Sequence, residues 1–167
     1  MLGTYSKFLN GIEKIVNVTI SALLFVAFII IFAQVIVRYV FHSGYPWMEE
    51  SARFMIIWMS FLGSAVAIRY RRHMFIDIFE TMLPQKGRMV LNVLFDLLMI
   101  TFFIIMVVLG YQYTVQNKSN FSAGLNISMA YVYISLIVGM FLMALYMVEC
   151  LWKRFAAGQA LPDDETA

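Results

Sequence analysis

The sequence predicts an all-α integral membrane protein with four transmembrane helices and both chain ends in the cytoplasm. Of its 167 residues, 62% are hydrophobic and only 13% are charged, whereas soluble domains carry about 25% charged residues. Four stretches stay apolar over the roughly 20 residues that a spanning helix needs. None of them alternates apolar and polar residues as the strands of a membrane β-barrel do. The net charge of +2 is too small to indicate nucleic-acid binding.

The four stretches cover residues 15–40, 47–68, 89–113 and 129–152. The first is longer than the apolar region of a cleaved signal peptide, so we expect it to be a retained signal-anchor helix. We expect one membrane domain over residues 1–155. The polar segment 156–167 is expected to be a disordered tail.

Positive charges predict the orientation of the helices, because Lys and Arg concentrate in cytoplasmic loops. With a cytoplasmic N-terminus, nine of them fall on the inner side: Lys7, Lys14, Arg69, Arg71, Arg72, Lys86, Arg88, Lys153 and Arg154. Trp47 and Trp152 would then anchor the chain at the outer and inner interfaces, respectively. The sequence therefore predicts an N-in, C-in topology.

The segment 73–83, HMFIDIFETML, lies on the cytoplasmic side between the second and third spans. Its polar residues share one arc of a helix and its apolar residues cover the rest. We predict a short amphipathic helix, which either lies on the inner membrane surface or packs against the ends of the other helices. Arg69, His73 and Asp77 are spaced four apart and would line one edge of a continuous helix.

The start of the second span carries the densest group of charges. Glu49 and Glu50 lie where the helix dipole favours negative charge. Arg53 can pair with either of them, and Arg38, at the outer end of the first span, is a further candidate partner. Two interpretations remain open. The group is either a charged docking site at the outer surface or a helix cap with a local ion pair.

The second span also carries small residues along one face. Small side chains allow helices to approach closely in lipid. The pattern therefore predicts a helix–helix contact, with a neighbour either in this chain or in another. The residues of this small-residue stripe are Ser60, Gly63, Ser64 and Ala67.

Asp96 and Glu149 lie near the inner ends of the third and fourth spans, where carboxylates are candidates for a proton relay. Glu149 can alternatively pair with Lys153 four residues later, and Asp96 is expected to face a neighbouring helix. We expect no cofactor in this chain, because His42 and His73 belong to opposite membrane faces. Cys150 is the sole cysteine, which excludes an internal thiol pair.

Prolines are absent from the interiors of the four spans. Transporters that bind substrate at the membrane midplane use broken helices with Gly and Pro interruptions. We therefore expect an accessory or scaffold subunit rather than a complete substrate path.

Three segments together carry a resemblance to a known family. They are residues 34–41, QVIVRYVF, then Trp47-x-Glu49-Glu50-x-Ala52-Arg53, and then Trp58-x-x-Phe61-Leu62-Gly63-x-Ala65-x-Ala67-x-Arg69 followed by His73-x-x-x-Asp77. The chain resembles the small, DctQ-like membrane subunit of tripartite ATP-independent periplasmic (TRAP) transporters. It departs from the family pattern at residues 124–135, where prolines are missing.

The resemblance implies a multi-pass protein of the bacterial inner membrane that is not an enzyme. It implies a scaffold for Na+-coupled import of organic acids of the sialic-acid or C4-dicarboxylate class. The partners would be a large M-type elevator subunit, where Na+ is expected, and a periplasmic P-type substrate-binding protein. The segments around His42 and from Arg72 to Asp77 are most similar to those of sialic-acid systems. The candidate interface or structural ion-pair residues are Arg38, Glu49, Glu50, Arg53, Arg69, His73 and Asp77.

Two other functions remain as alternatives. A four-helix membrane enzyme or electron-transfer subunit would need a haem, quinone or thiol site. A small multidrug exporter would need a membrane-embedded carboxylate in the first helix, and residues 15–40 contain none.

Overall fold

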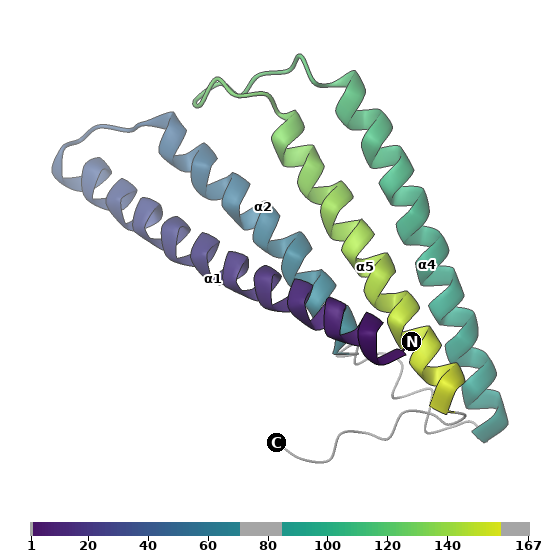
Figure 1. Ribbon diagram of the computed structural model, residues 1–167. Helices are drawn as coiled ribbons and strands as arrows, with labels where there is room; N and C mark the ends of the chain where they lie inside the picture. Colours follow the sequence, from purple (N-terminus) through teal and green to yellow (C-terminus); the bar gives the residue numbers. More distant parts are fainter. Residues whose placement is uncertain (1, 71–84, 158–167) are drawn as a thin grey trace.

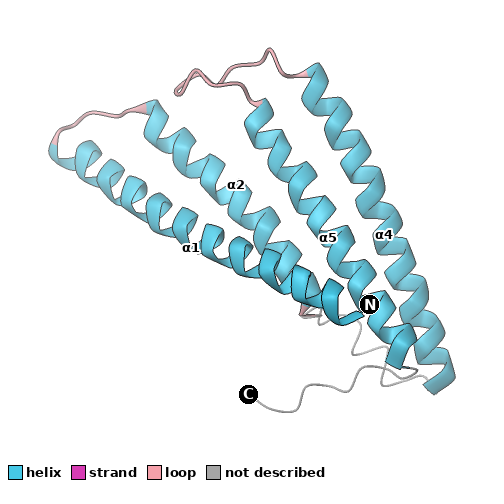
Figure 2. Cartoon of the chain, in the orientation of Figure 1, coloured by secondary structure: helices cyan, strands magenta, loops and turns pink. Residues whose placement is uncertain are grey.

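A computed structural model describes residues 2–70 and 85–157, with side chains at 7, 9–70 and 91–152. The described chain folds into four helices: α1 (Leu2–Val40), α2 (Pro46–Arg69), α4 (Gln85–Gln116) and α5 (Ala130–Ala157) (Figures 1 and 2). The predicted amphipathic helix 73–83, with His73 and Asp77, lies outside the described residues. So does most of the predicted tail.

Each helix contains a stretch that is long and apolar enough to cross a membrane: Leu9–Val40, Pro46–Arg69, Leu91–Gln116 and Ala130–Trp152. The predicted all-α fold with four spanning helices is therefore confirmed, while the N-in, C-in orientation stays a prediction. All four helices run past the predicted spans because hydropathy detects only the apolar part of a helix. The largest difference is at α1, which begins at Leu2 rather than near residue 15.

The helices form a row in the order α1, α2, α5, α4, with α2 and α5 in the middle (Figure 1). Glycine allows the two central helices to touch. A Cβ atom added at Gly139 of α5 would lie 2.6 Å from the Cβ of Phe61 on α2. Gly110 of α4 meets Leu136 of α5 equally closely, at 2.6 Å. The close packing of the row thus depends on glycines at the helix contacts.

Most of the core lies toward one end of the row. We call this the inner end, because it holds the start of α1, the end of α2 and the end of α5, which the charges predict to be cytoplasmic. The opposite end is the outer end. The core residues come from all four helices: Leu9, Ala65, Ile68, Phe103, Met143, Tyr146 and Met147.

Burial is uneven between the middle and the flanks of the row. In the most apolar stretch of α5, 39% of the residues are buried, against 6% in α1. Large apolar side chains such as Phe25, Phe28 and Leu98 are more than half exposed. An exposed apolar surface of this extent requires lipid or another protein to cover it.

Two connections close the outer end. Residues 41–45 join α1 to α2, with His42 in the left-handed region at φ 49°. Residues 117–129, which we call the outer loop, join α4 to α5. The outer loop is ordered by a bridge between Phe121 and Ser128, in which the Ser122 N–H donates to the Ile127 carbonyl at 2.9 Å.

Candidate functional site

The inner end holds a buried ion-pair cluster centred on Arg69, the last residue of α2. Its Nε donates to Glu149 Oε2 of α5 at 3.1 Å. Its Nη1 forms an ion pair with Glu13 of α1 and donates to the Leu9 carbonyl at 3.2 Å, and its Nη2 donates to Asn10 Oδ1. One guanidinium therefore connects three helices.

Arg69 and its two carboxylate partners are largely shielded from solvent. The side chains of Arg69, Glu13 and Glu149 are 8%, 12% and 3% exposed. The ring of Tyr146, fully buried, lies with its centroid 5.3 Å from the Arg69 Cζ, and the Tyr70 hydroxyl donates to Glu13. A planar guanidinium suits this site because it binds two carboxylates and an aromatic face at once.

We call Arg69, Glu13, Glu149 and Asn10, with the adjoining Tyr70 and Tyr146, the inner cluster. The sequence pointed to Arg69 as an ion-pair residue but missed Glu13 and Asn10, which precede the predicted span. A sequence signal for Glu13 was available, because it is a carboxylate near the inner boundary of the first helix, at the level of Arg69. Glu149 pairs with Arg69, and its predicted partner Lys153 lies beyond the described side chains.

Glu13 bears on the expectation that the first helix has no membrane-embedded carboxylate, which considered residues 15–40 alone. The apolar stretch of α1 begins at Leu9 and therefore contains Glu13. That carboxylate is paired with Arg69.

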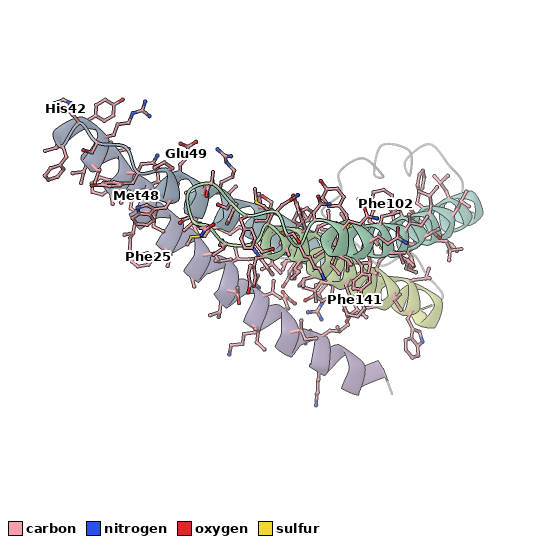
Figure 3. All side chains as sticks on the ribbon, turned by 90° about the horizontal axis from the view of Figure 1, so that it is seen from above. Phe25, His42, Met48, Glu49, Phe102 and Phe141 are labelled. Atoms are coloured by element: carbon pink, nitrogen blue, oxygen red, sulfur yellow. The ribbon has the colours of Figure 1, made fainter. Side chains whose placement is uncertain are left out.

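At the outer end the predicted charges separate into two arrangements. Arg53 Nη2 lies 3.0 Å from Glu49 Oε1, an i,i+4 pair whose side chains are 63% and 64% exposed. Glu50 points instead to the outer loop, where its Oε2 accepts from the N–H groups of Gly124 at 2.9 Å and Leu125 at 3.0 Å. The glutamates that are adjacent in sequence thus have different partners. In Figure 3 the carboxylate of Glu49 lies at the margin of the helix row.

Glu50 holds the outer loop tightly against the start of α2. The Ser122 hydroxyl is a third donor to Glu50 Oε2. A Cβ atom added at Gly124 would lie 2.8 Å from the Pro46 carbonyl carbon and 2.9 Å from Glu50 Oε2. We call Glu50, Ser122, Gly124 and Leu125 the loop clamp.

The local ion pair of the second interpretation is present as Glu49–Arg53, and the docking interpretation stays a prediction. The N-cap of α2 is Tyr45, which makes no side-chain capping bond, and Pro46 starts the helix. Arg38 is exposed and takes no part in the ion pairs found among residues 2–70 and 85–157. Trp47 and Trp152 lie at opposite ends and are 42% and 46% exposed, as interfacial anchors would be.

The small-residue stripe of α2 is not covered by the described part of this chain. Ser60, Ser64 and Ala67 are exposed, and a Cβ atom added at Gly63 would meet nothing within 4 Å. The buried residues of α2 belong to another face: Ala52, Leu62, Ala65 and Ile68. The helix–helix contact predicted from the stripe therefore stays a prediction, and none of these four helices supplies it.

Asp96, the other candidate for a proton relay, is buried on α4, and that role stays a prediction. Over residues 2–70 and 85–157 no group of three or more His, Cys, Asp or Glu side chains could hold a metal ion.

Comparison with known proteins identifies the family. The model described as "Tripartite ATP-independent periplasmic transporters, DctQ component" matches residues 14–157. The chain belongs to this family. The match covers α1 from residue 14 onward and the whole of α2, α4 and α5, and it includes residues 124–135, where the expected prolines are missing.

Three curated relatives extend the comparison. The chain is 38% identical over 93 residues to the sialic acid TRAP transporter permease protein SiaT of Haemophilus influenzae, which covers 55% of this chain and 14% of that protein. It is 31% identical over 100 residues to a putative TRAP transporter small permease protein of H. influenzae, 60% of each chain. It is 31% identical over 133 residues to the sialic acid TRAP transporter small permease protein SiaQ of Vibrio cholerae, 80% of this chain and 75% of the relative. The chain thus spans less than two thirds of the first two relatives.

Family membership confirms several predictions. The chain is a DctQ-type small TRAP subunit and a multi-pass protein of the inner membrane. It is a transporter component rather than an enzyme, because the related proteins are transporter subunits. The membrane-enzyme and multidrug-exporter alternatives are thereby set aside.

Proposed function

We propose that this chain is the scaffold subunit of a Na+-coupled importer of organic acids and pairs with a large elevator-type membrane subunit. The observation that carries the proposal is the open row of four helices, whose apolar flanks and small-residue stripe are left uncovered by the described residues. The relative SiaT supports a large partner, because the chain matches only 14% of that permease protein. Na+ would bind in the large subunit.

The small-residue stripe is the face that we assign to the large subunit. Its hydroxyls bond within α2, Ser60 to the Ile56 carbonyl and Ser64 to the Ser60 carbonyl, each at 2.8 Å. The hydroxyls therefore carry little desolvation cost when the stripe is covered, and a partner helix can approach the backbone at Gly63 closely.

The outer end is the face that we assign to a periplasmic substrate-binding protein. The exposed pair Glu49–Arg53 and the exposed Arg38 offer charges for docking. The loop clamp fixes the outer loop beside them. This assignment rests on the predicted N-in, C-in orientation.

The substrate is proposed to be sialic acid, with a C4-dicarboxylate as the second candidate. Two of the relatives named above are sialic acid transporter proteins. The test is uptake into proteoliposomes that contain this chain, a large TRAP membrane subunit and a substrate-binding protein. We expect labelled sialic acid to accumulate only with all three components and a Na+ gradient. Full uptake by the large subunit alone would overturn the scaffold role.

The stripe assignment has a matched test. Ser64→Leu places a bulky side chain on the stripe, whereas Ser21→Leu makes the same change on α1, where Ser21 is exposed and also bonds back to its own helix at Asn17. We expect Ser64→Leu to reduce co-purification of the large subunit and Ser21→Leu to leave it intact. If both variants recover the same amount of the large subunit, the stripe is not part of the interface.

A further inference from the structure

The inner part of α1 presents an exposed basic face. Lys7 and Lys14 are seven residues apart and therefore lie within about 20° of each other around the helix. Asn17 falls within about 60° of Lys14, and all three side chains are exposed. Lys14 and Asn17 also line a shallow hollow on this side of α1, which Asn10 of the inner cluster borders. We call Lys7, Lys14 and Asn17 the basic face.

The charges of the basic face are not compensated by the described part of the chain. Neither Lys7 nor Lys14 forms an ion pair with a residue that the structure describes. The sequence of α1 contains one carboxylate, Glu13, and that carboxylate is bound by Arg69 and Tyr70 of the inner cluster. Two positive charges therefore remain on one side of the helix for an anionic occupant.

The basic face extends past the inner end of α2. Arg69, the last residue of α2, binds the Leu9 carbonyl and Glu13, so the residues before Leu9 lie beyond that end. The apolar stretch of α1 also begins at Leu9, which places Lys7 outside it. With 39 residues α1 is about 58 Å long, against about 30 Å for the hydrocarbon core of a bilayer. An occupant that reaches both lysines must extend into water, which favours a hydrophilic chain over a lipid.

The sequence supplies such a chain in the segment that follows α5. Residues 163–165, Asp-Asp-Glu, form the one run of three consecutive carboxylates in the sequence, and we call them the acidic run. They lie outside the described residues. Four spanning helices return the chain to the side on which it began, so the acidic run and the start of α1 share one side of the membrane whichever way the protein is oriented.

The acidic run is close enough to reach the basic face. Arg69 binds Glu13 of α1 and Glu149 of α5, so both helices adjoin the end of α2. From that level α5 continues for eight residues to Ala157, about 12 Å, and Lys7 is six residues before Glu13, about 9 Å in the same direction. The six residues from Ala157 to the start of the acidic run span about 20 Å when extended. Two helices packed against a common third are separated by at most about 20 Å.

We propose that the acidic run docks on the basic face of α1 within the same chain. Its carboxylates would pair with Lys7 and Lys14 and accept a hydrogen bond from the Asn17 carboxamide. Attachment to α5 gives the acidic run an effective concentration in the millimolar range. Exposed ion pairs are individually weak and are screened by salt, so the contact is a reversible latch that shields the two lysines. The inference is independent of which substrate the transporter carries and of which face meets the large subunit.

The first experiment is zero-length cross-linking with a carbodiimide, which joins a lysine amine to a carboxylate in contact with it. The full chain is treated in mild detergent, and linked peptides are identified by mass spectrometry in the monomer band. We expect the acidic run to be linked to Lys7 and Lys14, with a yield that falls severalfold in 1 M salt. Lys118 is the control, because it is equally exposed but lies at the outer end. Links from the acidic run to Lys86 or Lys153 in place of α1 would overturn the proposal.

The same reaction in lipid nanodiscs tests the competing occupant. Discs of phosphatidylcholine have no net charge, whereas discs with phosphatidylglycerol present anionic headgroups to the basic face. We expect the links to Lys7 and Lys14 to form in both. Their loss in phosphatidylglycerol alone would mean that lipid headgroups occupy the basic face in a membrane, and the proposal would be wrong.

A second measurement leaves the lysines unchanged, so it does not depend on variants that alter the insertion of α1. Spin labels are attached at Thr19→Cys and Thr166→Cys in a Cys150→Ser background. Thr19 is exposed on α1 and points away from the basic face, about 120° from Lys7 around the helix. We expect a narrow distribution of distances between the two labels, measured by double electron–electron resonance. A broad distribution in the parent chain would overturn the proposal.

Neutralising the acidic run completes this measurement. The variant carries the three amide substitutions Asp163→Asn, Asp164→Asn and Glu165→Gln, and its control removes two other carboxylates through Asp77→Asn and Glu80→Gln. We expect the first to broaden the distance distribution severalfold and the second to leave it narrow. Equal broadening in both would show that overall charge, and not the acidic run, places the segment.

Discussion

At the inner end Arg69 is enclosed by three helices, whereas at the outer end Arg53 pairs along its own helix and stays exposed. The Arg69 side chain is 8% exposed and has partners on α1 and α5. The Arg53 side chain is 63% exposed and pairs with Glu49 four residues earlier. Both arginines belong to α2, so the difference arises from the packing of neighbouring helices and not from the local sequence.

The difference shows where charge holds the fold together. A buried charge is costly unless it is paired and hydrogen-bonded, so losing one partner at the inner end leaves the others uncompensated. An exposed pair gains little, because water screens it and two long side chains must be held in place. We therefore expect the inner cluster to be structural and the Glu49–Arg53 pair to be free for contacts with other proteins.

Removing the Arg69 side chain should have the largest effect. Arg69→Ala leaves Glu13 and Glu149 buried together without their cation, which we expect to lower the free energy of unfolding by roughly 3–5 kcal/mol. The thermal melting temperature of the purified protein, followed by tryptophan fluorescence, measures the loss. Adding Glu13→Gln and Glu149→Gln should recover part of it. If the triple variant melts no higher than Arg69→Ala, uncompensated charge is not the cause.

Disrupting the contact between the two central helices, α2 and α5, should cause the next largest loss of stability. In Gly139→Ala the new methyl group would lie 2.6 Å from Phe61 Cβ and 3.3 Å from its backbone, so α2 and α5 must separate. Overpacking of this kind costs about 1–3 kcal/mol. The control is Gly63→Ala on α2, where the added carbon meets nothing within 4 Å. A melting temperature lowered equally by both changes would contradict the close contact.

Loss of the loop clamp should have a local effect at the outer end. Glu50→Ala removes the acceptor shared by Ser122, Gly124 and Leu125, leaving two backbone N–H groups without it. We expect faster hydrogen exchange in the outer loop, measured by mass spectrometry, and a smaller drop in melting temperature than for Arg69→Ala.

Gly124→Ala tests the same clamp from the side of the loop. The added carbon would lie 2.9 Å from Glu50 Oε2, so it should reproduce the faster exchange without altering a charge. Protection of the outer loop equal to that of the parent chain in both variants would show that the loop is held by its own Phe121–Ser128 bridge alone.

The sequence predicted the local features better than the contacts between distant elements. Hydropathy located all four spanning helices, and the i,i+4 spacing identified a reachable partner for Arg53, because both depend on neighbours along the chain. The partners of Arg69 are 56 to 80 residues away, and those of Glu50 are 72 to 75 residues away. Charge and spacing alone do not determine such pairs, since they depend on the order of helices in the row.

The smallest effect on stability is expected at Arg53. This variant separates the structural role of α2 at the inner end from its proposed docking role at the outer end. Both side chains of the Glu49–Arg53 pair are more than 60% exposed. Arg53→Ala should therefore change the free energy of unfolding by less than about 1 kcal/mol. If the pair docks the binding protein, the same variant should weaken transport in proteoliposomes at limiting binding-protein concentration, and added salt should weaken the parent in the same way. Unchanged transport at every concentration would leave Glu49–Arg53 as a local pair and transfer the docking role to the outer loop.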